Sequence, residues 1–359
     1  MQLTVKAGFH ARQNCPVSVC LPQGMPDGSY ALITPASDRI PAYAADGILT
    51  FVLPSLGAGE SLTLCVEAAD SAQKPACASD VKGDRIAISV AGRPYTEYYF
   101  GEKTPKPYLG PLYGPYGEQV TRLNFDEKEH KHHRSLWFSH GIVNGVDTWG
   151  ELEGKHGYIE NKGITNAVSS DAYTAFTAHN VWTDGEHQPL ADDSTIFRFY
   201  NTPAEACVFD AELTLTASYG EVTLGATKEG GPLAVRVNYN LTVPNTGRFE
   251  TGSGGVNEKE IWMSRAPWCD YYGIQDGRTV GVAILDNPKN TRYPAWWHAR
   301  DYGLMAANFF NLGGDMHIPT GKSETFRFRV VVHAGSAKEA GIAEKFTDYA
   351  YPPEVSVEE

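Results

Sequence analysis

Hydrophobic and polar positions alternate with a period of two along much of the chain, or collect into short apolar runs bounded by Gly, Pro, Asn or Asp. Successive side chains of a strand point to opposite faces, so this pattern is typical of strands in antiparallel sheets. The clearest runs lie at residues 16–21, 49–54, 61–67, 85–90, 195–200, 211–218, 220–227, 233–241, 279–285 and 325–333. The pattern predicts an all-β protein built from large antiparallel sheets.

One stretch follows helical spacing instead. Residues 336–349 read SAKEAGIAEKFTDY, and apolar positions recur at 342, 346 and 350. Ser336 precedes this pattern, and a serine hydroxyl is a common cap for the first turn of a helix. We therefore expect a helix near the C-terminal end.

The order of these signals divides the chain in two. Residues 1–80 carry strand and turn signals but few candidate catalytic groups, which predicts a small N-terminal β module. The stretch SAQKPACASDVKGD at 71–84 is rich in Ala, Ser and Lys and is the best linker candidate. Residues 81–359 would then form a large β sandwich that carries the helix at its C-terminal end and has long loops available for function.

Charge and composition exclude several classes of partner. The net charge is -13 at pH 7 and no stretch gathers Lys and Arg, whereas nucleic-acid binding needs a positive field. No apolar segment is long enough to cross a bilayer, and the first residues lack the features of a secretory signal. The six cysteines are scattered without CxxC spacing, which favours free thiols in a reducing compartment. We expect a cytoplasmic protein with no nucleic-acid or membrane partner.

The strongest chemical signal is a histidine-rich segment. Four of the eleven histidines lie in the stretch DEKEHKHHRSLWFSHGIVNGVDTWGE at 126–151. Imidazoles titrate near neutral pH, bind metals and act as acids or bases. Regular strand alternation would place His130 and His132 on one face and His133 on the other. The spacing matches no standard zinc motif, and a histidine-rich surface loop is the structural alternative.

The second half of this segment contains a polar turn. His140, Asp147, Trp149 and Glu151 surround an Asn-Gly pair that begins at Asn144, the strongest local turn signal in the sequence. Sugar sites combine polar side chains with an aromatic platform, and both occur here. A hairpin with a polar tip is the alternative.

Glu229 lies on a glycine-rich turn between two expected strands, and Arg236 lies on the second of them. A carboxylate at a strand end can be directed into a cleft, so Glu229 is the best isolated candidate for a general base. Lys228 beside it would favour the ionised carboxylate. A solubilising surface glutamate is the alternative.

The run WWHARDY at 296–302 includes Trp297, His298 and Arg300. If the whole run were core, it would bury an imidazole and two ionic groups that need partners. The run therefore points to a polar site, and a salt bridge between Arg300 and Asp301 is the structural alternative. The chain has no GxSxG, phosphate-binding glycine loop or dinucleotide fingerprint.

Five segments together resemble one bacterial family. They are KPYLGPLYGPYGEQVTR, EHKHHRSLWFSHGIVNGVDTW, TKEGGPLAVRV, LDNPKN and WWHARDYGLMAANFF. The family is of unknown function and is often labelled PmoA-like or methane-oxygenase-like. The resemblance covers nearly the whole chain, and HHRxLWFxHGxVNGxDxW is its most specific part. The chain has Glu-His-Lys at 129–131, where that family more usually has Asp-His-Pro.

The resemblance implies a soluble β-supersandwich of the galactose mutarotase-like type, an architecture found among carbohydrate-active proteins. It also implies a role in sugar catabolism, with an oxidised (3-keto) sugar or a glycoside as the substrate. The methane-oxygenase label names membrane proteins, and this chain has no spanning segment. Because a fold does not fix a reaction, the chemistry has to come from the residues.

The leading hypothesis is a carbohydrate-active enzyme that cleaves or rearranges a glycoside or 3-keto sugar by acid/base chemistry. The expected proton carriers, which are also candidate metal ligands, are His133, His140 and His298, with Glu229 as the base. The expected substrate-binding residues are Arg134, Asn144, Asp147, Trp149, Arg236, Trp297 and Arg300. A 3-carbonyl acidifies the C2 proton, so one base and one acid suffice to eliminate the C1 substituent. One divalent metal ion on the carbonyl would stabilise the enolate.

Three alternatives stay open. An aldose mutarotase or epimerase would break no glycosidic bond, and a non-catalytic sugar-binding protein would keep its tryptophans but use its histidines only for structure. Both would share the expected partner, a small-molecule carbohydrate. A non-haem iron oxygenase would need two histidines and a carboxylate around one open position. The sequence predicts neither the oligomeric state nor the metal requirement.

Overall fold

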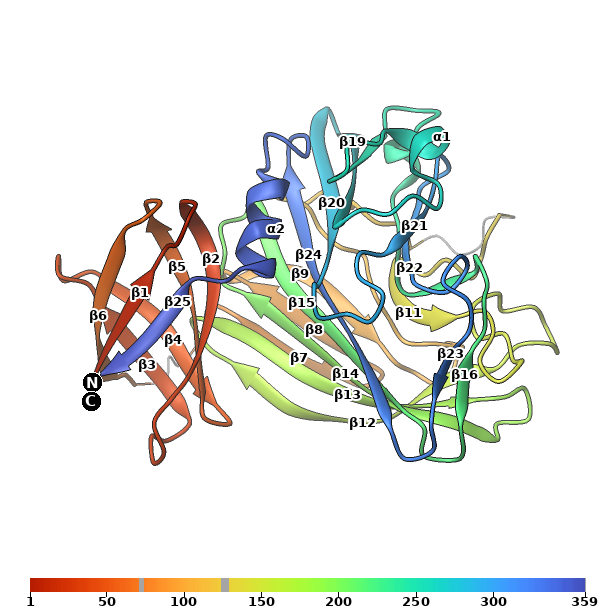
Figure 1. Cartoon of the computed structure of the whole chain (residues 1–359), viewed down its shortest axis with the longest axis horizontal. Coiled ribbons are helices and arrows are strands. Elements are labelled where there is room, and N and C mark those ends of the chain that lie inside the picture. The colour runs from red at the N-terminus through yellow and green to blue at the C-terminus, as the bar shows by residue number, and fades with distance from the viewer. Residues whose placement is uncertain (71–73, 124–128, 359) are drawn as a thin grey trace.

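The computed structural model describes residues 1–70, 74–123 and 129–358. Strands make up most of it, and the paired strands of each sheet are antiparallel (Figure 1). The prediction of an all-β protein with large antiparallel sheets is confirmed.

The first sheet has seven strands and lies to one side of the molecule, with β1–β6 in red and β25 in blue in Figure 1. Its order is β2 (Arg12–Cys20), β5 (Ile48–Leu56), β4 (Arg39–Ala45), β3 (Gly28–Ile33), β6 (Ser61–Ala68), β1 (Gln2–Lys6) and β25 (Glu354–Glu358). Alternate side chains such as Leu3, Val5 and Leu64 are buried, because strand alternation directs them to one face. The sheet therefore has a hydrophobic core of its own.

Two eight-stranded sheets form the rest of the molecule. The second sheet runs β21 (Trp296–Arg300), β22 (Leu304–Asn308), β17 (Gly230–Arg236), β11 (Leu136–His140), β10 (Tyr108–Leu109), β9 (Arg93–Tyr99), β8 (Arg85–Val90) and β7 (Ala78–Lys82). The third runs β12 (Tyr158–Ser169), β13 (Tyr173–Thr183), β14 (Pro189–Tyr200), β15 (Ala206–Thr216), β24 (Ser323–Ala334), β20 (Arg278–Asp286), β19 (Trp268–Gln275) and β18 (Arg248–Thr251).

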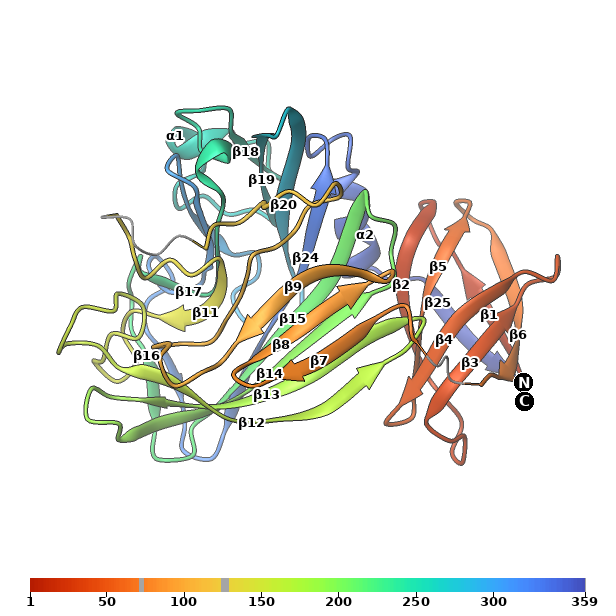
Figure 2. The same ribbon diagram turned by 180° about the vertical axis from the view of Figure 1, so that it is seen from behind.

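The main hydrophobic core lies between these two sheets. Phe138, Val235 and Trp297 enter it from the second sheet, and Phe197 and Phe328 enter it from the third. Figure 2 shows the β7–β9 part of the second sheet in front of the third. The remaining elements are short: a two-stranded ribbon of β16 (Val222–Leu224) and β23 (Met316–Ile318), the 3-10 turn η1 (Tyr239–Leu241), α1 (Asn257–Ile261) and α2 (Ile342–Ala350).

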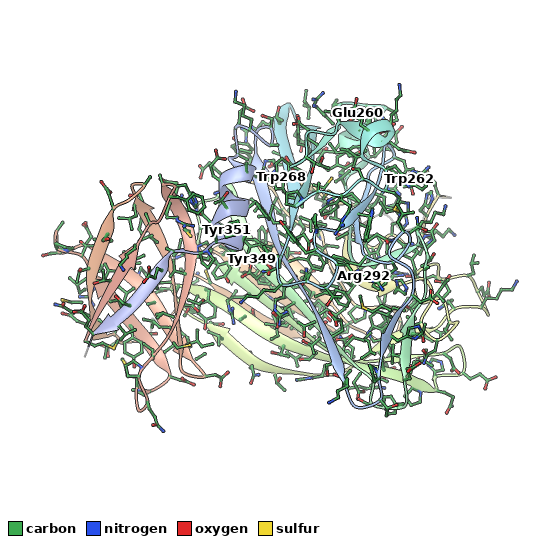
Figure 3. The ribbon with its side chains drawn as sticks, viewed as in Figure 1. Glu260, Trp262, Trp268, Arg292, Tyr349 and Tyr351 are labelled. Atoms are coloured by element: carbon green, nitrogen blue, oxygen red, sulfur yellow. The ribbon has the colours of Figure 1, made fainter. Side chains whose placement is uncertain are left out.

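The expected helix begins later than predicted. α2 starts at Ile342, after Gly341, whose φ of 64° is left-handed and stops the helix from extending further toward the N-terminus. Ser336 does not cap it, because its hydroxyl donates to Glu339 Oε2 at 2.8 Å in a separate turn. α2 packs on the third sheet, where the Arg329 guanidinium lies 4.6 Å from the ring centroid of Tyr349 (Figure 3).

Two strands do not follow the expected division at residue 80. β7 begins at Ala78, inside the expected linker, and is already the edge of the second sheet. β25 leaves the C-terminal part of the chain and pairs with β1, from Gln2 with Glu358 to Lys6 with Glu354. The alternation of a short edge strand is the same whichever sheet it joins, so local pattern does not assign it.

Two predicted strands are shorter than expected. The run at 220–227 keeps only β16, and the run at 233–241 ends at Arg236 before η1. All six cysteines are free, as the sequence predicts. Within the described ranges, no helix is long and apolar enough to cross a membrane.

Candidate active site

Some of the candidate residues, among them Arg236 and His298, lie on the face of the second sheet that points away from the third. We call this the outer face. Val235 and Trp297 belong to the sandwich core, so strand alternation directs their neighbours Arg236 and His298 to the opposite side. This placement separates the two tryptophans of the WWHAR run. Trp297 is fully buried and its indole donates to the Ala266 carbonyl at 2.9 Å, so it presents no face to a sugar.

Two rows of side chains cross the outer face. The cross-strand registers align His298, Ala306, Ala234 and Trp137 in one row and Arg300, Leu304 and Arg236 in the next. Alanine is small, so the middle of the first row leaves room between the larger residues at its ends. The rings of the 129–133 segment and Trp149 pack over this region.

His133 is buried and neutral. The Arg236 guanidinium donates to its Nδ1 at 2.9 Å, because an arginine has no lone pair to accept with. The His133 proton must then sit on Nε2, which has no partner among the residues that the structure describes. Burial lowers the pKa of His133 well below its ordinary value, and the neighbouring cations act in the same direction. His133 is therefore a hydrogen-bond donor rather than a cationic acid at neutral pH.

The rings of the histidine-rich segment form a cluster with near-parallel planes. The ring centroids of Trp137 and His133 are 5.4 Å apart, those of His133 and His130 are 4.7 Å apart, and those of His130 and Tyr302 are 4.6 Å apart. The Arg236 guanidinium lies 4.7 Å from the Tyr302 centroid, within cation–π range. These rings fix Arg236 at the edge of the outer face.

Glu229 occupies a turn that is held from below. Asn308 Nδ2 donates to the carbonyls of Thr227 and Gly230, both at 2.9 Å, and this anchors the turn to β22. The Glu229 side chain is 41% exposed, and its carboxylate lies 3.3 Å from Lys228 Nζ. The carboxylate is thus accessible to a ligand while its backbone is fixed.

His298 lies within the electrostatic range of this carboxylate. It is 1% exposed, and burial lowers its pKa to about 4, although Glu229 and the Lys228 carbonyl both favour the protonated ring. Neither ring nitrogen makes a well-aligned hydrogen bond within the described residues. The cluster therefore contains the accessible carboxylate of Glu229 and the neutral imidazole of His298, whose ring nitrogens can still form hydrogen bonds.

Arg300 and Tyr302 complete this cluster. The Arg300 guanidinium lies 2.9 Å from a Glu258 carboxylate oxygen and 5.4 Å from the Tyr302 centroid. Asp301 instead accepts a hydrogen bond from the Glu258 backbone, at 3.1 Å. The salt bridge considered between Arg300 and Asp301 does not form, because Glu258 of α1 takes that place.

Arg134 binds a carboxylate of the protein rather than facing the site. Its guanidinium makes two hydrogen bonds to Glu151, at 2.8 and 2.6 Å. Lys106, which is fully buried, lies 2.8 Å from the same carboxylate and also donates to the Trp149 carbonyl. Burial opposes ionisation of Glu151, but the two cations outweigh it and lower its pKa to about 2. The assignment of Arg134 to substrate is contradicted by this geometry.

The other predicted site residues stabilise loops or core. His140 Nε2 donates to the Gly225 carbonyl, 2.9 Å away, and the ring centroids of His140 and Phe310 are 4.4 Å apart. Asn144 bonds to the backbone of β16, and Asp147 accepts from the backbone of residues 149 and 150. Trp149 is 1% exposed and packs on Trp137. Of these four, His140 lies nearest to Glu229, because it pairs with Gly230 across β11 and β17.

The candidate metal ligands are also dispersed. Burial lowers the pKa of His132 to about 3 and that of His140 to about 4, so both are neutral imidazoles. Within residues 1–70, 74–123 and 129–358, no three side chains of His, Cys, Asp or Glu are grouped so that they could hold a metal ion. The divalent ion stays a prediction.

Sequence reasoning missed Tyr302, Glu258 and Lys106. Tyr302 follows Arg300 by two positions, so alternation offered a signal for it. Glu258 and Lys106 come from distant segments, and nothing local in the sequence pairs them with the site. Trp262, 46% exposed beside α1, is a further aromatic near β21, since the next residue, Met263, donates to the Trp297 carbonyl (Figure 3).

A family model described as a family of unknown function, DUF6807, matches residues 85–347. The match carries no methane-oxygenase label. No curated protein matches the sequence.

Two solved structures of low identity are similar to part of the fold. The GalM/aldose epimerase homologue from C. elegans is 7% identical, with 72% of this chain and 98% of that chain covered and a TM-score of 0.31. The galactose mutarotase related enzyme from Lactobacillus acidophilus is 8% identical, with 72% and 97% covered and a TM-score of 0.28. At these values neither likeness bears on activity, so the function has to be argued from the side chains.

Proposed function

The chain belongs to the DUF6807 family of unknown function, and we propose that it is a carbohydrate-active enzyme that uses Glu229 and His298 for acid/base chemistry on an oxidised (3-keto) sugar or glycoside. One observation carries the proposal: an accessible carboxylate lies near enough to a buried, neutral imidazole for its charge to act on that ring. A base and a proton donor within reach of one substrate are what general acid/base catalysis requires.

The proposed reaction begins at C2 of a 3-keto glycoside. Glu229 removes the C2 proton, and the electron pair moves onto the C3 oxygen to give an enolate. When the enolate collapses, a C1–C2 double bond forms and the C1–O bond breaks. The departing oxygen takes a proton from water or from the Glu229 carboxylic acid formed in the first step, while the neutral His298 ring donates a hydrogen bond, and an alcohol and an unsaturated 3-keto sugar result. Addition of water to that product would complete a net hydrolysis.

The cluster contains groups suited to each charge in this sequence. Arg300, held by Glu258, supplies a fixed cation for the enolate oxygen. A neutral imidazole such as His298 can donate a hydrogen bond to a developing oxyanion through its ring N–H. The half-buried ring of Tyr302 offers an apolar edge for the sugar. No step depends on a metal ion.

The test compares matched substrates. We expect p-nitrophenyl 3-keto-glucoside to release p-nitrophenol, p-nitrophenyl glucoside to be inert, and both Glu229→Gln and His298→Asn to be strongly impaired. Incubation in deuterium oxide before completion should exchange the C2 proton of remaining substrate if proton removal is reversible. Full activity in both variants would overturn the assignment.

Aldose mutarotation is the second candidate, because the same base and donor suffice and no ketone is needed. It is favoured if the protein accelerates the polarimetric equilibration of a free aldose and leaves the keto-glycoside unchanged. Saturable sugar binding without either reaction would instead support a binding protein.

A further inference from the structure

We propose that a second pocket, formed between β9, the start of β15 and the loop at 113–117, binds a small aromatic carboxylate. The pocket has a volume of about 550 Å³. In the second sheet, β10 and β11 separate β9 from β17, so this pocket is distinct from the Glu229 cluster. Its ligand need not be the sugar, and the inference does not depend on the proposed reaction.

Size and lining favour a flat, mostly apolar molecule. Small-molecule sites commonly measure roughly 300–1,000 Å³, and this volume falls inside that range. The rings of Tyr113 and Tyr116 and the apolar side chains of Val90 and Pro94 contribute to the wall. The Arg278 guanidinium lies 4.2 Å from the Tyr116 ring centroid and supports that ring from outside the pocket. These surfaces suit an aromatic body.

A buried hydroxyl supplies the first polar contact. Tyr95 lines the pocket, is 4% exposed, and its hydroxyl has no hydrogen-bond partner among the described residues. Burial raises the pKa of Tyr95 well above its ordinary value, with Cys207 acting in the same direction, so the hydroxyl keeps its proton. Buried donors are rarely left unpaired in folded proteins. The hydroxyl lies just below the accessible surface, so a ligand's acceptor oxygen would reach it with a small shift of the pocket wall.

A single cation sets the charge of the pocket. Arg93 is the only charged residue in its lining, and one hydrogen bond, to the Pro115 carbonyl at 3.3 Å, holds it to the loop. Burial raises the pKa of Cys207 to about 11; Arg93 acts against the rise and Glu205 adds to it, so the guanidinium and one carboxylate outside the lining both lie within electrostatic range of the neutral thiol. Glu118 does not line the pocket; its carboxylate accepts from the Tyr116 backbone at 3.0 Å and shapes the loop. An anion is therefore the complementary ligand.

Two fluorescent probes with similar bodies test the idea. The first, 8-anilinonaphthalene-1-sulfonate, is an aromatic anion, and N-phenyl-1-naphthylamine lacks the charge. We expect the anion to bind one saturable site and benzoate, but not benzamide, to displace it. Arg93→Ala should weaken the anionic probe by about tenfold, the size of one charge-assisted contact, and should leave the neutral probe nearly unchanged. Tyr95→Phe should weaken the anion by a smaller factor.

A blocking variant and a matched control complete the experiment. Pro94→Trp places a large ring at an exposed position of the wall and should abolish binding of both probes without altering the core. Arg85→Ala removes an arginine from the neighbouring strand, outside the pocket, and should change neither affinity. Binding that survives both Arg93→Ala and Pro94→Trp, or that benzoate and benzamide displace equally, would overturn the proposal.

Discussion

Glu151 and Glu229 both lie beside cations near the outer face, yet they differ in exposure and in the number of ion-pair partners that the protein provides. Glu151 is 9% exposed at its side chain, and both Lys106 and Arg134 bind it at close range. Glu229 is 41% exposed and has a single ion-pair partner at 3.3 Å, with a neutral imidazole nearby. The first carboxylate is fully satisfied by the protein, whereas the second retains capacity for a ligand. A carboxylate that is fully bound by protein cations indicates a structural role. An accessible carboxylate that can still bind a ligand indicates a functional role.

The largest expected effect separates the two glutamates by activity. Glu229→Gln keeps the size of the side chain but removes the base, and we expect kcat/KM to fall by about 10²- to 10⁴-fold, the usual range for a positioned base. The free energy of unfolding should change by less than about 0.5 kcal/mol, as for most surface substitutions. Kinetics on the 3-keto substrate and urea unfolding measure the two quantities. An equal loss of activity in Glu221→Gln, another exposed glutamate, would remove the distinction.

Glu151→Gln should show the reverse behaviour. Lys106 and Arg134 would be left near a neutral amide, and breaking a buried ion pair from one side costs about 3–5 kcal/mol of unfolding free energy. Turnover per folded molecule should change little. Urea unfolding measures the loss, and Glu153→Gln, at an exposed neighbouring position, is the control. If Glu151→Gln were as stable as Glu153→Gln, the ion pairs of Glu151 with Lys106 and Arg134 would not stabilise the fold.

Acid should weaken the wild type through the same network. The folded-state pKa of Glu151 is about 2, below its ordinary value of 4.5, so its stabilisation is present above about pH 4.5 and is lost as the pH falls toward 2. A difference of this size corresponds to about 3 kcal/mol, since each pKa unit is worth about 1.4 kcal/mol. Urea unfolding from pH 7 to 2.5 should show the wild type approaching Glu151→Gln as the pH falls. Parallel curves would contradict the assignment.

The smallest effect concerns a residue that the sequence placed in the site. Asn144 bonds to the Glu221 carbonyl and the Thr223 amide, at 3.1 and 2.7 Å. Asn144→Ala should lower the free energy of unfolding by about 1 kcal/mol, the typical value of such contacts. The KM for the keto-sugar should stay constant. A raised KM with unchanged stability would return Asn144 to the substrate site.

Alternation and turn residues predicted the class of fold and most strands, because both depend on neighbours in sequence. They could not predict which side chains of the WWHAR run point to the core and which point to the outer face. One of Trp296 and Trp297 had to face the core, but the choice follows from the pairing of β21 with β22, which no local pattern contains.

Charged side chains were harder to place for a related reason. Arg134 and Arg300 were both predicted to hold substrate, and the sequence did not show that each would also lie against a glutamate from elsewhere in the chain, Glu151 or Glu258. The identity of an arginine's partner depends on tertiary packing, and a protein carboxylate presents the same two oxygens as a ligand. Glu229 and His298 were both named from sequence, and the charge of Glu229 acts on the His298 ring, a proximity that no local pattern encodes.

The pairing of β1 with β25 has a consequence for the order in which the protein can be completed during synthesis. Strands β1 to β6 leave the ribosome early and can pair with one another at once, since chains fold from the N-terminal side as they emerge. The outer edge of β1 then stays open until residues 354–358 have been made. An open edge is a site for wrong pairing with other chains. The first sheet to form is thus closed only after the strands of both other large sheets have been made.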